Sequence, residues 1–426
     1  LASIVVMALA AVPVFGIPPG TTIPNTAVVD YSVVGADFTV SDTASVITDP
    51  SSGNSAPIGV SLAPSSVAEN ELGGTVGALV VDEFPDLVPQ TGEVLVKTLA
   101  CGICGSDLHA LKHADQFNEL APPSMQMDLS RDVVMGHEFC AEIIEHGPGC
   151  SATLPVGSRV CSVPVMVRGK PAQSVGYAND FPGGYGEHML LSEAMLLPVS
   201  NGLSTEHAAL TEPMAVGYHA VVKARIQPHE VPLVIGCGPV GLAVISALKL
   251  LGHAPIVAAD YSPRRRQLAE SMGADVIVDP ASTSPYESWA DAVRATEAGR
   301  TAEINPLSGE RTLPPGVFFE CVGVPGVLDQ MIVGATPGCR FVVVGVCMEP
   351  DQLRPMIAIT KELNLQFVLA YTGEEFAATL QHLAQGELDV APLVTGKVGV
   401  GGVAGAFEAL ASPEEHAKIL IEPWRD

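Results

Sequence analysis

Hydrophobic and polar positions in the second half of the chain alternate in the pattern of repeated strand and helix units. Residues 231–235 form a short apolar run that predicts a buried strand, and residues 242–251 have the apolar spacing of a helix. A second apolar run at 255–259 ends at Asp260. Repeated units of this kind predict an α/β domain with a parallel, doubly wound sheet.

The same alternation continues toward the C-terminus. We predict further strands at residues 275–278, 317–322, 340–345, 365–369 and 417–421, and helices at 284–298, 326–334 and 374–385. Residues 299–315 are expected to form a loop-like insertion. Upstream, residues 75–81 and 92–99 have the pattern of strands and are separated by two prolines and a glycine, which favour a turn.

The turn between the strand at 231–235 and the helix at 242–251 has the sequence of a dinucleotide-binding loop. Its residues are Gly236, Gly238, Pro239, Val240 and Gly241, in the pattern G-x-G-x-x-G. Gly236 allows a tight turn, Gly238 lets a pyrophosphate approach the backbone, and Gly241 lets the helix pack close to the strand. Alone, the pattern also occurs in ordinary glycine-rich turns. The flanking strand and helix favour the nucleotide, with loops near Gly323 and Val346 expected to face its nicotinamide.

An acid placed 24 residues after Gly236 predicts which nucleotide is used. Asp260 ends the second strand, where its carboxylate can bind the adenosine ribose hydroxyls and would repel a 2′-phosphate. Arg264, Arg265 and Arg266 follow it, and a nearby arginine such as Arg265 can instead accommodate that phosphate. Asp260 is nearer the expected ribose, so we predict NAD as the cofactor, with NADP disfavoured.

Composition and charge narrow the functional classes. The chain has 426 residues, which suits two domains, and a formal net charge of −26 with only 21 Lys and Arg. No basic patch is present, so we expect a small-molecule substrate and neither nucleic acid nor a membrane surface as partner. The nine cysteines are scattered and odd in number. They do not resemble a disulfide framework and favour a reducing, cytoplasmic location.

Residues 1–72 are an atypical leader. No Lys or Arg precedes Lys97, so the patterns of a secretory signal and of a transit peptide are both missing. The apolar run at 4–14 is too short to span a bilayer. The remainder predicts either a small β-rich appendage or a weakly ordered segment. We expect residues 1 to about 70 to be dispensable for catalysis.

Three widely spaced motifs carry side chains that can bind zinc. Cys104 lies in Gly-Ile-Cys-Gly-Ser-Asp-x-His, and His137 and Glu138 are adjacent in Gly-His-Glu. Glu212 begins Glu-Pro-Met-Ala-Val. A catalytic zinc uses three such ligands and keeps a fourth position open. Each residue also has an ordinary alternative, because Cys104 can be a buried apolar residue or the redox partner of Cys101, the histidine a core residue and each glutamate an ion-pair partner.

Taken in order, these motifs resemble the zinc-dependent medium-chain dehydrogenase/reductase superfamily. The set includes Gly-Gly-Tyr-Gly-Glu at residues 183–187, and the Glu-Pro variant is most similar to the sorbitol and threonine dehydrogenase branch. The resemblance implies a GroES-like, β-rich catalytic domain at 73–212, a Rossmann NAD-binding domain at 213–370 and a C-terminal segment at 371–426 that returns to the catalytic domain. It also implies a homodimer or homotetramer.

The resemblance assigns roles to single residues near the metal. Cys104 and His137 match the first two zinc ligands. Glu138 matches an acid that coordinates zinc or supports its ligands, and Glu212 matches the last protein ligand, directly or through water. Many members also hold a structural zinc in a four-cysteine lobe, but residues 160–184 contain only Cys161. We therefore predict one catalytic zinc per chain and no structural zinc.

Four further residues match positions around the reacting groups. Ser106 matches the hydroxyl that starts a proton relay, His109 its outer end and Asp107 an acid close to the zinc ligands. Lys418 matches a basic residue that approaches the cofactor pyrophosphate, although it can also be an ordinary surface lysine. The interval between the first two zinc motifs is longer than in the family, so residues 112–132 are either a surface insertion or a lip of the substrate pocket.

Together, these residues and the resemblance predict a zinc-dependent alcohol dehydrogenase that reversibly oxidises a secondary alcohol or polyol to a carbonyl with NAD. Two alternatives stay open. One is a zinc-free oxidoreductase of the same fold, of the quinone reductase type, which metal analysis would identify. The other is a non-catalytic nucleotide-binding protein, which would bind NAD without turnover.

Overall fold

The computed structural model divides the chain into two compact units. It describes residues 27–29, 58–69, 75–120, 128–168, 172–304, 309 and 311–425. The antiparallel unit comprises residues 2–212, 394–411 and 418–426, and the parallel unit comprises 213–393 and 412–417. Residues 371–393 thus group with the parallel unit, so a shorter C-terminal part returns to the antiparallel unit than the resemblance implied.

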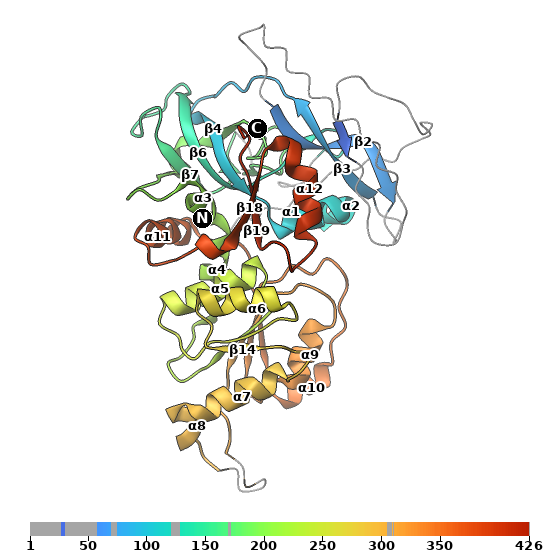
Figure 1. Cartoon of the computed structure of the whole chain (residues 1–426), viewed down its shortest axis with the longest axis vertical. Coiled ribbons are helices and arrows are strands. Elements are labelled where there is room, and N and C mark those ends of the chain that lie inside the picture. The colour runs from blue at the N-terminus through green and yellow to red at the C-terminus, as the bar shows by residue number, and fades with distance from the viewer. Residues whose placement is uncertain are drawn as a thin grey trace. The chain divides into compact units, whose positions relative to one another are not determined.

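The parallel unit, which carries the labels β14 and α5 to α10 in Figure 1, is built on a six-stranded sheet in the order β14-β13-β12-β15-β16-β17. The strands are β12 (Pro232–Ile235), β13 (Val257–Ala259), β14 (Val276–Val278), β15 (Val317–Glu320), β16 (Arg340–Val343) and β17 (Asn364–Phe367). The chain starts in the centre, runs outward to β14 and returns to β15 on the other side of β12. This order, with its reversal between β12 and β15, is that of the doubly wound dinucleotide-binding fold and confirms the predicted fold class.

Helices join these strands. They are α5 (Pro239–Leu250), α6 (Pro263–Met272), α7 (Pro285–Ala295), α8 (Glu297–Thr301), α9 (Val327–Gly334), α10 (Pro355–Thr360) and α11 (Gly373–Ala384), with a 3-10 turn η2 (Ala391–Leu393). The predicted elements agree to within a few residues, except that α8 occupies the start of the predicted loop at 299–315. The central strands β13, β12, β15 and β16 are largely buried, and the rings of Phe318 and Phe341 stack on one face with centroids 5.7 Å apart, whereas the edge strand β17 is mostly exposed.

The antiparallel unit contains a larger sheet of seven strands. Its path is β11-β7-β6-β4-β19-β18, and β10 also pairs with β4. The strands are β4 (Glu93–Gly102), β6 (Glu138–His146), β7 (Arg159–Ser162), β10 (His188–Ser192), β11 (Leu196–Pro198), β18 (Val394–Val398) and β19 (Lys418–Ile421). The pairing of β19 with the end of β4 ties the C-terminal part of the chain to this unit.

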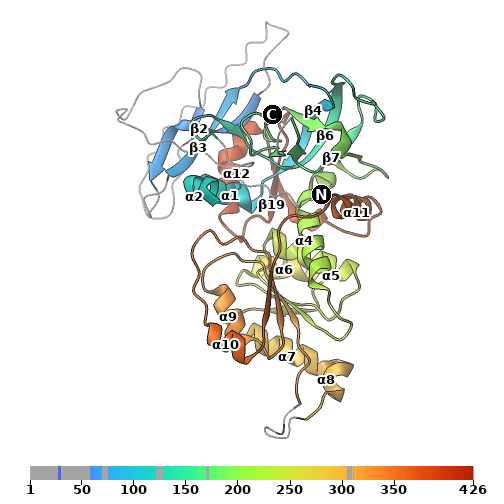
Figure 2. The same ribbon diagram turned by 180° about the vertical axis from the view of Figure 1, so that it is seen from behind.

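Shorter elements complete the antiparallel unit. They are α1 (Gly105–Lys112), α2 (Ala114–Leu120), α3 (Thr205–Ala209), α12 (Val403–Leu410), the hairpin β8 (Val165–Met166) and β9 (Gln173–Ser174), and the 3-10 turns η1 (Glu193–Met195) and η3 (Val400–Gly402). Helix α4 (Thr211–Ala224) begins at the last two residues of this unit. Figure 2 shows α1 and α2 beside β3. None of the described helices is long and apolar enough to cross a membrane.

Part of the leader belongs to a third sheet. Strands β1 (Ala27–Val29), β2 (Ile58–Glu69), β3 (Thr75–Glu83) and β5 (Val133–Val134) pair in the order β1-β3-β2-β5. Strand β2 lies between β3 and β5, so residues 58–69 pair within the antiparallel unit. The other residues of the leader lie outside the described part of the chain, as do residues 121–127 of the insertion at 112–132. That insertion continues from α1 into α2.

Candidate active site

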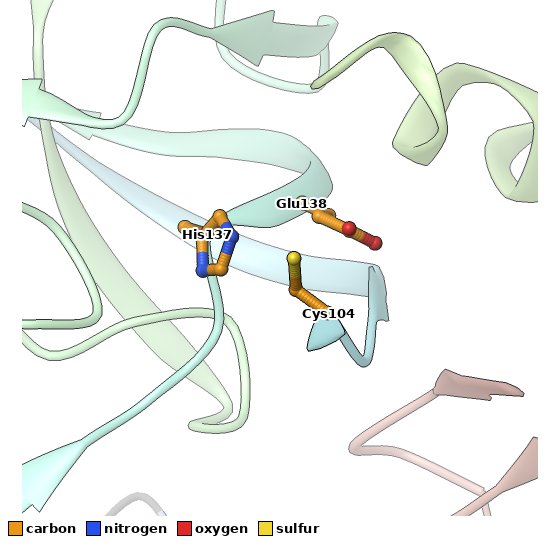
Figure 3. Close-up of side chains that lie close together, drawn as sticks. All are labelled: Cys104, His137 and Glu138. Carbon is orange, nitrogen blue, oxygen red and sulfur yellow. The ribbon is translucent and has the colours of Figure 1, made fainter. Parts of the chain in front are cut away.

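The predicted metal ligands Cys104, His137 and Glu138 come together at one end of the β4–β6 pair. Cys104 follows β4 and precedes α1, His137 precedes β6, and Glu138 is the first residue of β6. One ligand atom from each residue lies within 4.8 Å of the other two. Figure 3 shows the three side chains gathered at these strand ends. Sulfur, imidazole nitrogen and carboxylate oxygen are ligands that suit zinc.

Two local features bring the ligands close. Gly102 pairs with Glu138, and a Cβ on Gly102 would lie 2.0 Å from Glu138 Oε2, so a side chain there would displace the carboxylate. Helix α1 begins directly at the site because the Asp107 carboxylate accepts a hydrogen bond from the Cys104 backbone N–H at 2.9 Å. This bond holds the cysteine at the helix N-terminus.

Asp107 is the centre of a buried hydrogen-bond network. Its two oxygens accept bonds from the hydroxyls of Tyr177 and Tyr185, each at 2.6 Å. The Ser106 hydroxyl lies 2.8 Å from the Tyr177 hydroxyl oxygen. The single Tyr177 proton is donated to the carboxylate, so Ser106 is the donor in that second bond. The chain thus holds a Ser106–Tyr177–Asp107 path beside the metal ligands.

The His137 ring lies between this network and Cys104. Burial alone would lower the pKa of His137, but the charges of Asp107 and Cys104 outweigh burial and raise it to about 10. Its Nδ1 atom is buried without a hydrogen-bond partner and lies 3.6 Å from Asp107 Oδ1. A small shift would let Nδ1 donate to Asp107 and leave the other ring nitrogen for a metal, which is the usual support for a histidine ligand. The ligand set therefore fits zinc.

The structure places Lys418 differently from the sequence expectation. Its Nζ lies 2.7 and 2.8 Å from the two carboxylate oxygens of Glu138 and 3.0 Å from the carbonyl oxygen of Ile103. Only 1% of Lys418 is exposed, and none of Glu138 is. Burial alone would lower the pKa of Lys418, but Glu138 raises it. The Lys418 ammonium therefore neutralises the charge of Glu138 inside the antiparallel unit. This placement contradicts the expectation that Lys418 approaches the cofactor pyrophosphate.

The remaining predicted residues of this site lie around it. Glu212 is buried at the start of α4, and its charge adds to the raised pKa of His137, but it is not within the group of three ligands. Ser106 and His109 lie three residues apart on α1, on the same side of the helix. Burial, followed by the charges of His113 and a neighbouring lysine, lowers the pKa of His109.

The predicted nucleotide loop has the geometry that its glycines suggest. Gly236 has a φ of +90°, and a Cβ on Gly241 would lie 1.9 Å from the Gly236 carbonyl oxygen. A Cβ on Gly238 would meet nothing closer than 3.8 Å, so this position leaves room for a ligand. Helix α5 begins at Pro239 and Val240 without a side-chain cap, which leaves its first N–H groups for an anion.

Asp260 and Arg265 lie beside this loop. The Asp260 carboxylate accepts hydrogen bonds from the backbone N–H of Cys237 at 2.7 Å and of Ser262 at 2.8 Å. Arg265 Nη1 is 4.0 Å from Asp260 Oδ2. Arg266 instead bonds to the carbonyl oxygen of Asp260, among others. Arg265 thus lies beside both Asp260 and the nucleotide loop, where its guanidinium carbon is 3.8 Å from the place that a Cβ on Gly238 would take.

The two loops expected to face the nicotinamide meet after β15 and β16. Gly323 has a φ of +70°, and a Cβ there would lie 2.6 Å from the Val346 carbonyl oxygen. Glu320 holds the first loop because its carboxylate accepts bonds from the N–H groups of Val322 at 2.7 Å and of Gly323 at 2.9 Å. Burial raises the pKa of this carboxyl group.

Sequence reasoning did not assign roles to the two tyrosines. Tyr185 lies inside the Gly-Gly-Tyr-Gly-Glu motif at 183–187, so its place in the motif was an available signal. Tyr177 belongs to none of the motifs and reaches Asp107 only because the chain folds back after β9. Its contact joins residues 70 positions apart, which local patterns do not report.

Comparisons with known proteins agree with this geometry. Residues 90–201 match the model of the alcohol dehydrogenase GroES-like domain, and residues 239–385 match that of zinc-binding dehydrogenases. The chain is 33% identical over 353 residues to (R,R)-butanediol dehydrogenase of Bacillus subtilis, which covers 80% of this chain and 96% of the relative. It is 27% identical over 347 residues to sorbitol dehydrogenase of the same organism, covering 78% and 91%.

A solved structure supports the same assignment. The crystal structure of 2R,3R-butanediol dehydrogenase from Bacillus subtilis matches with a TM-score of 0.67 and 28% identity, covering 86% of this chain and all of that one. The chain therefore belongs to the zinc-dependent medium-chain dehydrogenase/reductase superfamily of alcohol dehydrogenases.

Proposed function

We propose that this chain catalyses the reversible NAD-linked oxidation of a secondary alcohol or polyol to a carbonyl compound. The chain is an oxidoreductase that acts on CH–OH groups, as its named relatives are. The observation that carries the proposal is the buried Cys104, His137 and Glu138 group beside the Ser106–Tyr177–Asp107 path. The names of the relatives favour diols and sugar alcohols as the first substrates to test.

The metal would be held by Cys104 and His137 together with a carboxylate. Glu138 is closest, but Lys418 already bonds to both of its oxygens. Glu212 is the alternative third ligand, directly or through water, and we expect one catalytic zinc per chain. When bound, zinc supplies Lewis-acid polarisation of the alcohol oxygen and NAD supplies the hydride acceptor.

The chain's own residues orient the substrate and move its proton. The Ser106 hydroxyl stands at the start of the path, and its proton now points to the Tyr177 oxygen. Rotation of this hydroxyl would let Ser106 Oγ accept the alcohol proton while it passes its own proton outward. His109 lies on the same side of α1, and its lowered pKa keeps the ring neutral and able to accept that proton near pH 7. Tyr177 and Asp107 fix the starting geometry.

Cofactor preference follows from Asp260 and Arg265. We expect NAD to be preferred because the Asp260 carboxylate would face a 2′-phosphate, although Arg265 lies 4.0 Å from it. Asp260→Ala should shift the ratio of kcat/KM values toward NADP. Adding Arg265→Ala to that variant should reverse part of the shift. Equal or better use of NADP by the unmodified enzyme would contradict the preference.

The decisive experiment for the reaction is an alcohol panel with the purified, zinc-loaded protein. Secondary alcohols, diols and sugar alcohols are tested with NAD and with NADP, and quinones are tested with the reduced cofactors. We expect turnover of at least one secondary alcohol and its loss in Cys104→Ala. Quinone reduction that survives Cys104→Ala would identify the zinc-free reductase. NAD binding without any turnover would identify a non-catalytic protein.

We further propose that the chain assembles as a homodimer or homotetramer. Strand β17 is an edge of the six-stranded sheet, and Phe367 on it is 70% exposed. Met356 and Ile359 on α10 are 70% and 69% exposed. An exposed apolar sheet edge favours pairing with another chain. Light scattering after size-exclusion chromatography should show Phe367→Glu as a smaller species, whereas Val88→Glu, which changes an exposed apolar residue of the antiparallel unit, should leave the mass unchanged.

We place the enzyme in a reducing compartment such as the cytoplasm. All nine cysteines are unpaired in the structure, and six of them are buried. Thiols of this kind persist where the environment is reducing. A tagged protein that is found in an oxidising compartment, with its cysteines in disulfides, would contradict this location.

A further inference from the structure

A second group of metal-binding side chains lies at the opposite end of strand β6. His146 is the last residue of β6, Cys150 follows in the turn to β7, and Glu193 begins η1. One ligand atom from each residue lies within 4.8 Å of the other two, the same limit as for the catalytic group. In the described part of the chain these are the two groups of His, Cys and acidic residues that meet this condition.

The hydrogen bonds of His146 prepare one ring nitrogen for a cation. Its Nε2 lies 2.9 Å from the carbonyl oxygen of Leu154, and a carbonyl can only accept, so Nε2 carries the proton. In the neutral ring Nδ1 then has a free lone pair. This arrangement, in which a histidine donates one N–H to a backbone carbonyl and offers the other nitrogen, is typical of histidine metal ligands.

The free nitrogen faces an acid without bonding to it. Nδ1 is buried, has no hydrogen-bond partner and lies 3.9 Å from Glu193 Oε1, which is too long for a hydrogen bond. A lone pair and a carboxylate oxygen at this distance repel each other unless a cation lies between them. Among the described residues, three buried side-chain atoms have no partner, and two of them are the Nδ1 atoms of His137 and His146.

The acid of this group is oriented by its surroundings. Glu193 accepts hydrogen bonds from the backbone N–H of Ser151 at 2.8 Å, from that of Ala152 at 2.7 Å and from the Ser151 hydroxyl at 3.1 Å. Oε1 accepts two of these bonds and Oε2 accepts one, so of the roughly four lone-pair sites of the carboxylate the one that remains for a metal is on Oε2; a metal bound by Oε1 would displace the Ser151 hydroxyl. Cys150 Sγ donates a weak bond to the carbonyl oxygen of Glu93 at 3.3 Å and also interacts with the Glu193 carboxylate.

The separations suit a tetrahedral zinc after small side-chain movements. Zinc lies about 2.3 Å from sulfur and about 2.0–2.1 Å from nitrogen, so its ligand atoms lie roughly 3.3–3.7 Å apart. The side chains must therefore move together by about 1 Å, as those of the catalytic group must. All three residues are only partly exposed, which leaves a solvent-facing position for a fourth ligand.

We infer that His146, Cys150 and Glu193 form a second site for a thiophilic divalent metal, with zinc as the natural occupant. The site is distinct from the four-cysteine lobe, which residues 160–184 do not contain and for which we predict no zinc. With this second site, the expected number of bound metal ions is two per chain. A metal there would tie the turn after β6 to the start of η1. The hydroxyl described at this group, that of Ser151, donates to Glu193 and lies 2.9 Å from Thr153 Oγ1 in an exposed turn. It does not lead into a buried tyrosine and acid as Ser106 does, so we assign the site a structural role.

Metal counting on single-site variants tests the inference. Purified protein is loaded with Zn²⁺ or Co²⁺, dialysed and analysed for bound metal, and the Co²⁺ form is also examined for its thiolate-to-metal absorption. We expect two equivalents in the unmodified chain and one in Cys150→Ala. Cys104→Ala should also retain one equivalent and its thiolate absorption, and the double variant should lose that absorption. Cys347→Ala, which removes an exposed cysteine, is the matched control and should keep two.

His146→Gln gives an independent variant if Cys150→Ala does not fold. It too should bind one equivalent and keep the native circular dichroism spectrum. One equivalent in the unmodified chain, with thiolate absorption that disappears in Cys104→Ala alone, would overturn the inference and identify the group as an ordinary histidine–glutamate pair. A second equivalent that persists in both Cys150→Ala and His146→Gln would overturn it as well, because the metal would then be bound elsewhere.

Discussion

The two ends of strand β6 carry the same three ligand types in different surroundings. Glu138 begins the strand and His146 ends it, so the two groups are separated by about 25 Å of extended chain. At the first end the acid is fully buried and balanced by Lys418. At the second end the acid is partly exposed and held by backbone N–H groups of the turn after β6.

This difference shows that ligand identity alone does not define an active site. The group around Cys104 lies beside a buried set of hydrogen bonds that joins Ser106 to Tyr177 and Tyr177 to Asp107, an acid that both tyrosines hold in place. The group around Cys150 has a preorganised histidine, and the hydroxyl at this group, that of Ser151, is exposed and bonds to Glu193 and Thr153 without reaching a buried acid such as Asp107. Chemistry is therefore expected at the first end, and stabilisation of a turn at the second.

The largest expected effect is a difference in kcat/KM between Cys104→Ala and Cys150→Ala. Cys104→Ala should reduce kcat/KM by about 1000-fold or more, because bound zinc contributes several kcal/mol of charge stabilisation to the reaction. Cys150→Ala should leave kcat/KM within about two-fold while it removes one metal equivalent. Steady-state kinetics on zinc-loaded proteins measure both. If Cys150→Ala lost turnover as Cys104→Ala does, the distinction between a catalytic and a structural end of β6 would fail.

The next effect tests how the buried acid is balanced. Lys418→Met should destabilise the protein by about 3–5 kcal/mol, because it leaves the Glu138 charge buried and unpaired. The double variant Lys418→Met/Glu138→Gln should recover most of that loss. Urea denaturation measures the free energy of unfolding. A loss below about 1 kcal/mol in the single variant would show that Glu138 does not depend on Lys418.

A smaller effect concerns the support of His137. Asp107→Asn keeps the shape of the side chain but removes the charge that faces the ring, and changes of this kind typically reduce metal affinity or activity about 10–100-fold. The metal at His146 should be unaffected, because a backbone carbonyl supports that ring. Competition with a chelator, followed on Co²⁺ protein, measures both affinities. Equal weakening at both ends would indicate a general loss of folding.

The pH dependence at the catalytic end has a defined sign. The pKa of His137 in the metal-free protein is raised from 6.5 to about 10, so its contribution to stability is fully present below about pH 6.5 and is lost as the pH rises through about 10. Zinc needs the neutral ring and competes with that proton. The Tm difference between the zinc-loaded and metal-free forms of Cys150→Ala should therefore widen from pH 6.5 to 9.5. A constant or shrinking difference would contradict the raised pKa.

The strands and helices of the parallel unit could be predicted closely because the sequence pattern of each one lies within the element itself. Each strand is a continuous apolar run and each helix an apolar stripe, and their order leaves one common sheet topology. The exception is α8 (Glu297–Thr301), a short helix whose start depends on the cap that the Thr296 side chain gives to Gly299 N–H. The predicted loop did not account for this cap.

At the candidate site, only those residues that lie inside sequence motifs could be predicted. Cys104, His137 and Glu138 were identified from their motifs, and the structure brings them together. Lys418 was assigned to the wrong partner because sequence spacing does not show that β19 pairs with the end of β4. The group at His146 lies in no motif, and its three residues meet only when the turn after β6 approaches η1.

The smallest expected effect is on metal binding after truncation of the leader. We expect it at the catalytic end of β6 and not at the other end. Removal of residues 1–56 should leave turnover and both metals unchanged. Removal of residues 1–70 also deletes β2, which pairs with both residues of β5 just before His137. Because the second group rests on the seven-stranded sheet instead, the longer truncation should weaken metal binding at the catalytic end by a few-fold and spare the metal at Cys150. Equal metal content and activity in both truncations would restore the original expectation that the whole leader is dispensable.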